Sequence, residues 1–103
     1  MFDLNKKTVL ITGGCGLLGV QHAEAILEFG GEVILADIVS DEKRQRVVDS
    51  LIMKYNDAVI SSYYMDVTNK SSIQSVVDKI NKIDVLINNA ALDPKVESGL
   101  EWK

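Results

Sequence analysis

The sequence contains a single cysteine, a single proline and no excess of positive charge, and each shortage excludes a class of protein. With Cys15 alone, no disulfide can form within the chain, which suits a reducing cytoplasm. One proline and seven glycines exclude collagen-like and proline-rich chains. Because 11 Lys and Arg stand against 15 Asp and Glu, the net charge of −4 disfavours contact with the phosphates of nucleic acids.

Long apolar runs are absent as well. No run approaches the ~18 residues of a membrane span, and residues 1–7 lead straight into an apolar run, which leaves no room for a signal peptide. Hydrophobic residues make up 47% and charged residues 25%, a globular rather than a disordered composition. We therefore expect a single-domain cytoplasmic protein that binds neither membranes nor nucleic acid.

Short β-branched runs alternate along the chain with longer segments of helical period. The expected strands cover residues 8–12, 32–37, 58–65 and 84–88. Runs rich in Val and Ile without polar alternation are typical of a parallel sheet covered by helices on both faces. Right-handed crossovers then predict a Rossmann-type doubly wound α/β sheet with strand order 3-2-1-4. We expect this dinucleotide-binding domain at residues 1–91, followed by a loop or tail at 92–103.

Three helices are expected between these strands. The first covers residues 17–29 and stops at a pair of glycines. Ser40 and Asp41 offer N-cap oxygens to the second helix, and Thr68 is the expected N-cap of the third. The third helix has the clearest apolar stripe in the sequence, formed by Ile73, Val76, Val77 and Ile80.

A glycine cluster follows the first strand, and it contains the pattern Gly14-x-Gly16-x-x-Gly19. In a dinucleotide site such glycines let the chain turn sharply, let bare main chain approach a pyrophosphate, and let the helix pack closely. The N-terminus of that helix adds unpaired N–H groups and a partial positive charge. The ligand is expected where the strand order reverses, at the carboxyl ends of the first and fourth strands.

An acidic residue, Asp37, ends the second strand at close to the ~20-residue spacing expected of a ribose-binding carboxylate. A carboxylate there accepts hydrogen bonds from ribose hydroxyls and repels a 2′-phosphate. Neither Cys15 nor Ile38 supplies a compensating cation, so NAD is favoured over NADP. The alternative is a glycine turn that serves packing alone, with Asp37 a solvated strand end.

Four motifs in register resemble the short-chain dehydrogenase/reductase family. They are TGGCGLLG at residues 12–19, Asp37, the pair Asp66-Val67 after the third strand, and Asn88-Asn89-Ala90-Ala91 after the fourth. The resemblance implies a Rossmann-type subunit that uses NAD(H) to oxidise an alcohol or reduce a carbonyl.

The resemblance also implies roles for single residues. Asp66 would accept a hydrogen bond from the adenine amino group, with the Val67 backbone beside the ring. Asn88 to Ala91 would line the adenosine ribose side, and Asn89 would help to fix the central strand. The expected cofactor-binding residues are Gly13, Gly14, Cys15, Gly16, Leu17, Leu18, Gly19, Asp37, Ile38, Asp66, Val67, Asn88, Asn89, Ala90 and Ala91.

Two departures from the family pattern bear on function. The spacing of Gly13, Gly16 and Gly19 is that of extended members, the sugar-nucleotide epimerases and dehydratases, whereas Asn-Asn-Ala-Ala is typical of compact members. This mixture is most similar to compact oxidoreductases associated with flagellin and surface-glycan modification in bacteria. The catalytic Tyr-x-x-x-Lys pair of the family is missing, because Val59, Val67 and Thr68 stand four residues after the three tyrosines.

The chain is therefore expected to be the cofactor-binding fragment of an NAD-dependent oxidoreductase, without catalytic residues, without a metal site and unable to transfer hydride alone. An extended-type epimerase or dehydratase and a non-catalytic dinucleotide-binding module remain as alternatives. If the sheet stops at the fourth strand, its apolar edge is expected to promote self-association. The substrate contacts of the family come mostly from segments outside this sequence, so the substrate stays open.

Overall fold

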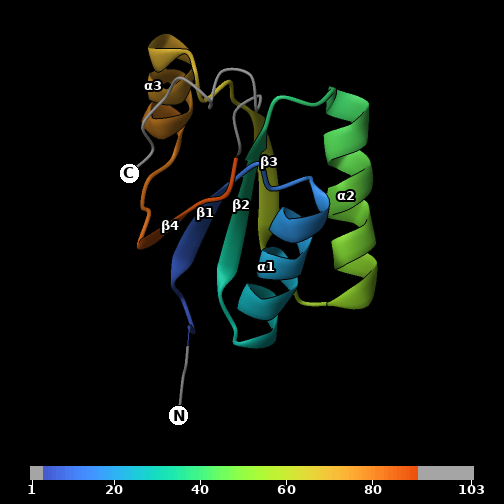
Figure 1. Cartoon of the computed structure of the whole chain (residues 1–103). Helices are drawn as coiled ribbons and strands as arrows, with labels where there is room; N and C mark the ends of the chain where they lie inside the picture. The colour runs from blue at the N-terminus through green and yellow to red at the C-terminus, as the bar shows by residue number, and fades with distance from the viewer. Residues whose placement is uncertain (1–3, 91–103) are drawn as a thin grey trace.

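Strands and helices alternate strictly in the computed structural model of the chain, which describes residues 4–90. The elements are β1 (Thr8–Thr12), α1 (Leu17–Glu28), β2 (Glu32–Asp37), α2 (Asp41–Lys54), β3 (Ile60–Tyr64), α3 (Lys70–Lys79) and β4 (Val85–Asn88). Figure 1 shows them as one layered unit. The tail expected at 92–103 lies outside the described residues.

The four strands form one parallel sheet in the order β3-β2-β1-β4, as the sequence predicts. Leu10 of β1 lies between Ile34 of β2 and Leu86 of β4. At the carboxyl end of β1, Thr12 lies between Ala36 and Asn88. The loops that follow β1, β2 and β4 therefore leave the sheet side by side (Figure 1).

Helices cover both faces of the sheet, which confirms the predicted layers: α1 and α2 lie on one face and α3 on the other (Figure 1). Because strand side chains alternate between faces, Val9, Ile11 and Leu35 pack with residues of α1 and α2. Their neighbours Leu10 and Ile34 pack towards α3. The buried residues of β1 and β2 thus form two apolar cores.

The outer strand β4 is far less buried than β1 and β2. Val85 is 41% exposed and Leu86 is 59% exposed. Within residues 4–90, β4 pairs only with β1. Val77, which the sequence places on the apolar stripe of α3, is also 40% exposed. Apolar side chains are thus exposed on β4 and on α3.

The ends of α1 and α2 follow the predicted signals. Gly30 has a φ of +85° and donates its N–H to the Leu27 carbonyl at 3.1 Å, while the Gly31 N–H reaches the Ile26 carbonyl at 3.0 Å. This pair of bonds is a Schellman motif, which ends α1. Ser40 caps α2, because its hydroxyl accepts the Lys43 N–H at 3.2 Å.

The N-cap of α3 differs from the prediction. Asn69, not Thr68, caps the helix, and its side-chain oxygen accepts the Ser72 N–H at 3.1 Å. Thr68 instead turns its hydroxyl towards the carboxylate of Asp66. No helix among the described residues is long and apolar enough to cross a membrane.

Candidate nucleotide-binding cleft

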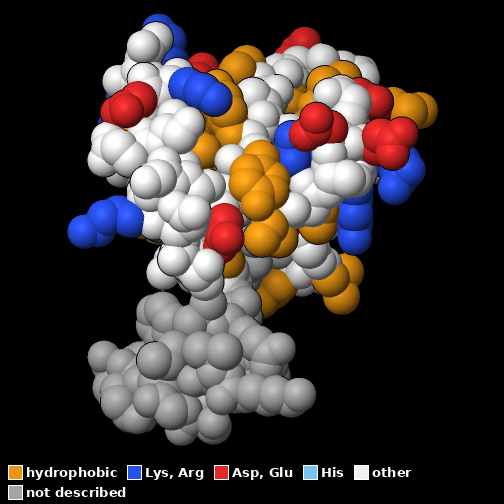
Figure 2. Space-filling model, turned by 90° about the horizontal axis from the view of Figure 1, so that it is seen from above, with side chains coloured by type: hydrophobic (Ala, Val, Ile, Leu, Met, Phe, Trp, Pro, Cys, Tyr) orange, Lys and Arg blue, Asp and Glu red, His pale blue; other side chains and the backbone are white. Residues whose placement is uncertain are grey.

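A cleft of about 640 Å³ opens at the carboxyl ends of the strands. It is formed by the β1–α1 loop, the end of β2, the β3–α3 loop and the end of β4. Figure 2 views the molecule from above and shows apolar side chains gathered across the middle of this face, with charged side chains around them. The cleft is lined by Gly13, Gly16, Leu17, Leu18, Asp37, Ile38, Met65, Asp66, Val67, Thr68, Asn89 and Ala90.

The β1–α1 turn is packed tightly on one side and open on the other. Gly13 has a φ of +64°, and a Cβ there would lie 2.9 Å from the Cα of Ala90. A Cβ at Gly19 would collide with the carbonyl oxygen of Gly13. At Gly16, in contrast, a Cβ would meet nothing nearer than 3.6 Å. The main chain is therefore bare where it faces the cleft, at Gly16.

No side-chain hydrogen bond caps the N-terminus of α1. Its N-cap, Gly16, makes no side-chain hydrogen bond, and no acidic residue lies in the first turn. The first N–H groups of a helix have no partner within the helix and carry a partial positive charge. Among residues 4–90, no Lys or Arg lines the cleft. The main-chain N–H groups at this turn are thus the groups that attract an anion.

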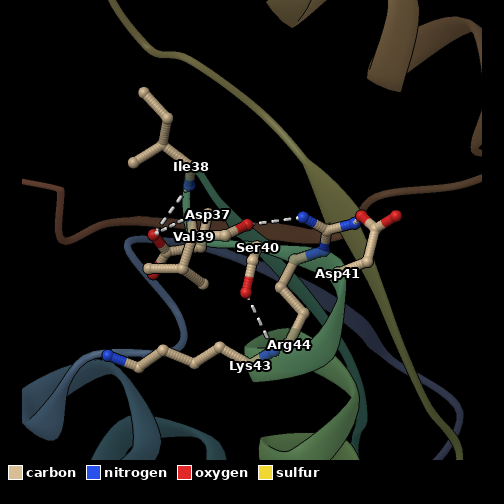
Figure 3. Close-up of polar contacts among 7 residues, drawn as sticks. All are labelled: Asp37, Ile38, Val39, Ser40, Asp41, Lys43 and Arg44. Carbon is tan, nitrogen blue, oxygen red and sulfur yellow. Dashed lines mark hydrogen bonds and ion pairs between the residues drawn. The ribbon is translucent and has the colours of Figure 1, made fainter.

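Asp37 joins the end of β2 to the glycine turn. Its Oδ2 accepts the Cys15 N–H at 2.9 Å, and its Oδ1 accepts the N–H of Ile38 at 2.7 Å. Figure 3 shows the carboxylate folded back over its own loop. The side chain is partly exposed and lines the cleft. Asp37 is therefore an ordered acceptor in the cleft wall rather than a solvated strand end.

A buried arginine supports the loop after β2. Arg44, in the first turn of α2, donates to the Val39 carbonyl at 2.7 Å and pairs with Asp41. Its side chain is only 10% exposed, although it belongs to the run of charged residues that begins α2. Lys43 extends from the helix in another direction (Figure 3). The guanidinium bonds to the loop and does not line the cleft.

Thr12 connects the loops that follow β1 and β4. Its hydroxyl donates to Asn88 Oδ1 at 2.9 Å and accepts the N–H groups of Asn89 at 3.0 Å and Ala90 at 3.2 Å. Asn89 returns a side-chain hydrogen bond to the Gly13 carbonyl at 3.2 Å. These bonds make the two loops one rigid wall, and they turn the Asn88 side chain towards the sheet.

On the opposite side of the cleft, Asp66 is held by its neighbours in the β3–α3 loop. Its Oδ1 accepts both the N–H and the hydroxyl of Thr68, and its own N–H donates to Ser72 Oγ at 2.9 Å. The hydrogen bonds from Thr68 hold the pKa of the Asp66 carboxyl below its ordinary value. Asp66 is therefore an anionic acceptor at neutral pH.

Cys15 does not present its thiol to the cleft. The side chain is 6% exposed and belongs to the apolar core between the sheet, α1 and α2. Burial, and then the charge of Asp37, raise the pKa of the Cys15 thiol to about 11. The thiol stays protonated at neutral pH, so it is no nucleophile. The residue contributes its main-chain N–H, which holds Asp37.

The structure thus divides the predicted site residues between the cleft surface and the layer behind it. Gly14, Cys15, Gly19 and Asn88 lie behind the surface, where they pack the turn or bond to it. Ala91 lies outside the described residues. The other predicted residues line the cleft.

Sequence reasoning missed two residues of the cleft surface, Met65 and Thr68. Both flank the Asp66-Val67 pair, and the Asp-x-Thr spacing, typical of a hydrogen-bonded turn, was the available signal for Thr68. Within residues 4–90, no group of three or more His, Cys, Asp or Glu side chains could hold a metal ion.

Comparisons with known proteins agree with this geometry. The family model for short chain dehydrogenases matches residues 7–101. A short chain dehydrogenase/reductase of Gibberella zeae is 36% identical over 99 residues, which is 92% of this chain and 35% of the relative. The chain therefore spans about a third of the length of the curated relatives that it matches.

Solved structures of other proteins have the same fold as this chain. A structure of NAD⁺-bound xylitol dehydrogenase has a TM-score of 0.74 and 32% identity, over 88% of this chain and 35% of that one. An NADPH-bound short chain oxidoreductase from Pseudomonas aeruginosa has a TM-score of 0.82, over 89% of this chain and 37% of that one. At 21% identity, the second comparison shows the fold alone.

Proposed function

The chain belongs to the short chain dehydrogenase family of oxidoreductases, and from that premise we propose that it is the NAD-binding portion of an enzyme that oxidises an alcohol or reduces a carbonyl. The observation that carries the proposal is the position of Asp37. This carboxylate is fixed in the cleft wall beside the open main chain at Gly16, and no Lys or Arg of the described part of the chain lines the cleft.

The turn at the start of α1 fits a pyrophosphate. The space beside Gly16 is open, the helix N-terminus has no side-chain cap, and the main chain around it faces the cleft. An anion in this position would meet N–H donors and the positive end of the helix dipole. A Cβ at Gly16 would take part of this space. The residues present therefore fit the diphosphate group of a dinucleotide.

Asp37 would accept hydrogen bonds from the hydroxyls of the adenosine ribose. Three main-chain N–H groups already bond to its oxygens, those of Cys15, Ile38 and Val39, but a carboxylate has about four acceptor positions and can take a further donor at Oδ2. A 2′-phosphate would place a second negative charge against it. Arg44 does not offset this repulsion, because it is bonded to Val39 and Asp41. We therefore assign NAD rather than NADP.

The far end of the cleft would hold the adenine. Asp66 would accept its amino group, with the Val67 main chain beside the ring, while Asn89 and Ala90 line the ribose side. Among the solved relatives, xylitol dehydrogenase is bound to NAD⁺. When bound, the nicotinamide supplies the hydride acceptor or donor of the reaction.

The reaction itself would need groups from the remainder of a longer enzyme. We assign no catalytic residue in this chain, since none of Tyr55, Tyr63 and Tyr64 is followed by lysine at the fourth position. The isolated chain would then bind NAD without turning over an alcohol. We place the protein in the cytoplasm, because its only cysteine has no partner for a disulfide.

The exposed apolar residues of the edge strand β4 support self-association of the isolated chain. Val85 and Leu86 are exposed on β4, which pairs with one strand only within residues 4–90. An apolar, half-paired edge strand can pair with a second copy. Light scattering over a concentration series tests this, and a constant monomer mass at high concentration contradicts it.

An extended-type epimerase or dehydratase is the second candidate. Leu17, which is 82% exposed at the cleft, stands where compact members usually carry glycine. A non-catalytic dinucleotide-binding module has the same cleft. The sequence beyond Lys103 in the genome distinguishes the non-catalytic module from the two enzymes, because only the enzymes require a catalytic segment.

The nucleotide assignment is tested by calorimetric titration with NAD and NADP. The wild type should bind NAD more tightly, and Asp37→Ala should lose that preference. Glu42→Ala is the matched control, because it removes an equal charge from an exposed position of α2 outside the cleft. Equal or tighter binding of NADP by the wild type contradicts the assignment.

A further inference from the structure

Among the described residues, the Asp66 carboxylate accepts hydrogen bonds through Oδ1 alone. Thr68 donates to Oδ1 twice, from its main-chain N–H at 2.9 Å and from its hydroxyl at 2.6 Å. Within the part of the chain that the structure describes, no group donates to Oδ2. Both residues line the cleft. Thr68 thus fixes the rotation of the carboxylate and leaves a single oxygen for a ligand.

The main chain of Asp66 is fixed independently. Its N–H donates to Ser72 Oγ at 2.9 Å, in the first turn of α3. The preceding residue, Met65, donates its N–H to the Asp37 carbonyl at 3.0 Å and so ties the loop to the end of β2. With the main chain held in this way, rotation of the side chain is the remaining freedom, and the N–H and the hydroxyl of Thr68 both restrict it.

Building on the proposed nucleotide site, we propose that Thr68 is a positioning residue that sets the base specificity of the cleft. By occupying Oδ1 of Asp66, it presents Oδ2 as an acceptor at the position of the base. An acceptor fixed there selects a purine that carries its amino donor at C6, as adenine does. A purine with a carbonyl oxygen in that place would put two acceptors against each other.

A purely structural role for Thr68 leads to a different result. If the Asp-x-Thr turn only closed the loop, removal of the hydroxyl would loosen the cleft for every dinucleotide alike. If Thr68 positions the carboxylate, removal of its hydroxyl lowers the affinity for the amino-bearing base and does not lower the affinity for the carbonyl-bearing base. The ratio of the two affinities therefore separates the two roles.

The test compares wild type, Thr68→Val and Thr68→Ser by calorimetric titration with NAD and with nicotinamide hypoxanthine dinucleotide. Val keeps the shape and the main-chain N–H but loses the hydroxyl, whereas Ser keeps the hydroxyl. Wild type and Thr68→Ser should prefer NAD. Thr68→Val should lose about fivefold in NAD affinity, the effect of one hydrogen bond, with no loss of affinity for the hypoxanthine dinucleotide.

Equal losses for both dinucleotides, or an unchanged preference in Thr68→Val, overturn the positioning role while the nucleotide site stands. A wild type that binds neither dinucleotide overturns the proposed function, and the specificity role with it. Titration of the Asp66 carboxyl by NMR checks the contact without any ligand. The pKa of Asp66 should rise in Thr68→Val and stay low in Thr68→Ser, whereas an equal pKa in the two variants contradicts the contact.

Discussion

The substitution Thr12→Val should separate the loops that form one wall of the cleft. Thr12 is 6% exposed, and its hydroxyl takes part in three hydrogen bonds between β1 and the end of β4. Valine has nearly the same shape but can make none of them. The change therefore removes polar contacts without opening a cavity.

The expected loss of stability follows from these contacts. Three hydrogen bonds at about 1 kcal/mol each give ~3 kcal/mol. Burial of a methyl group in place of the hydroxyl stabilises the folded state by about 1 kcal/mol. The free energy of unfolding should therefore fall by about 2 kcal/mol, a large share of the 5–15 kcal/mol typical of a domain.

Urea unfolding followed by circular dichroism measures this loss. Thr8→Val is the matched control, because Thr8 lies on the same strand, is 9% exposed, and makes no side-chain hydrogen bond among the described residues. Thr12→Ser should recover most of the stability, since it keeps the hydroxyl. If Thr12→Val loses no more than Thr8→Val, the network does not connect the two loops.

Three other outcomes are expected. Asp84 accepts the Thr8 N–H at 2.7 Å, which holds the pKa of the Asp84 carboxyl below its ordinary value. This hydrogen bond therefore stabilises the fold at neutral pH, and the stabilisation is lost as the pH falls below about 4. Urea unfolding should show Asp84→Asn to be less stable than wild type at neutral pH, with a smaller gap in acid; a constant gap contradicts this. Cys15 should react slowly with a thiol reagent near neutral pH and quickly once guanidinium unfolds the chain, and equal rates would show an exposed thiolate. Gly19→Ala should destabilise the fold far more than Gly16→Ala, whose Cβ meets open space; similar melting temperatures would refute the packing described for the turn.

The sequence was sufficient to predict the sheet and the place of the cleft. Val- and Ile-rich runs of strand length, separated by helical periods, leave few topologies once right-handed crossovers are required. The glycine turn and the position of Asp37 were also predictable. Each depends on a short stretch of sequence, the glycines after the first strand and the acid at the end of the second. These features depend little on distant contacts.

Features that depend on tertiary contacts were not predictable. Thr68 and Asn69 are both able to cap a helix, and only the position of Asp66 decides that Thr68 bonds to the carboxylate and Asn69 to the helix. Arg44 is buried because the Val39 carbonyl lies close enough to accept a hydrogen bond from its guanidinium. Neither the choice of the cap nor the burial of Arg44 can be inferred from the sequence of one helix alone.

The most direct test of the central claim is a titration of the ¹⁵N-labelled chain with NAD, followed residue by residue in NMR spectra. The amides of Gly16, Ile38 and Val67 should shift together and saturate. A second cavity of about 470 Å³, at the opposite ends of the strands, serves as the internal control, and its Gly31 and Val59 amides should not move. Shifts confined to that second cavity, or no saturable shifts at the cleft, would contradict dinucleotide binding at the carboxyl ends of the strands.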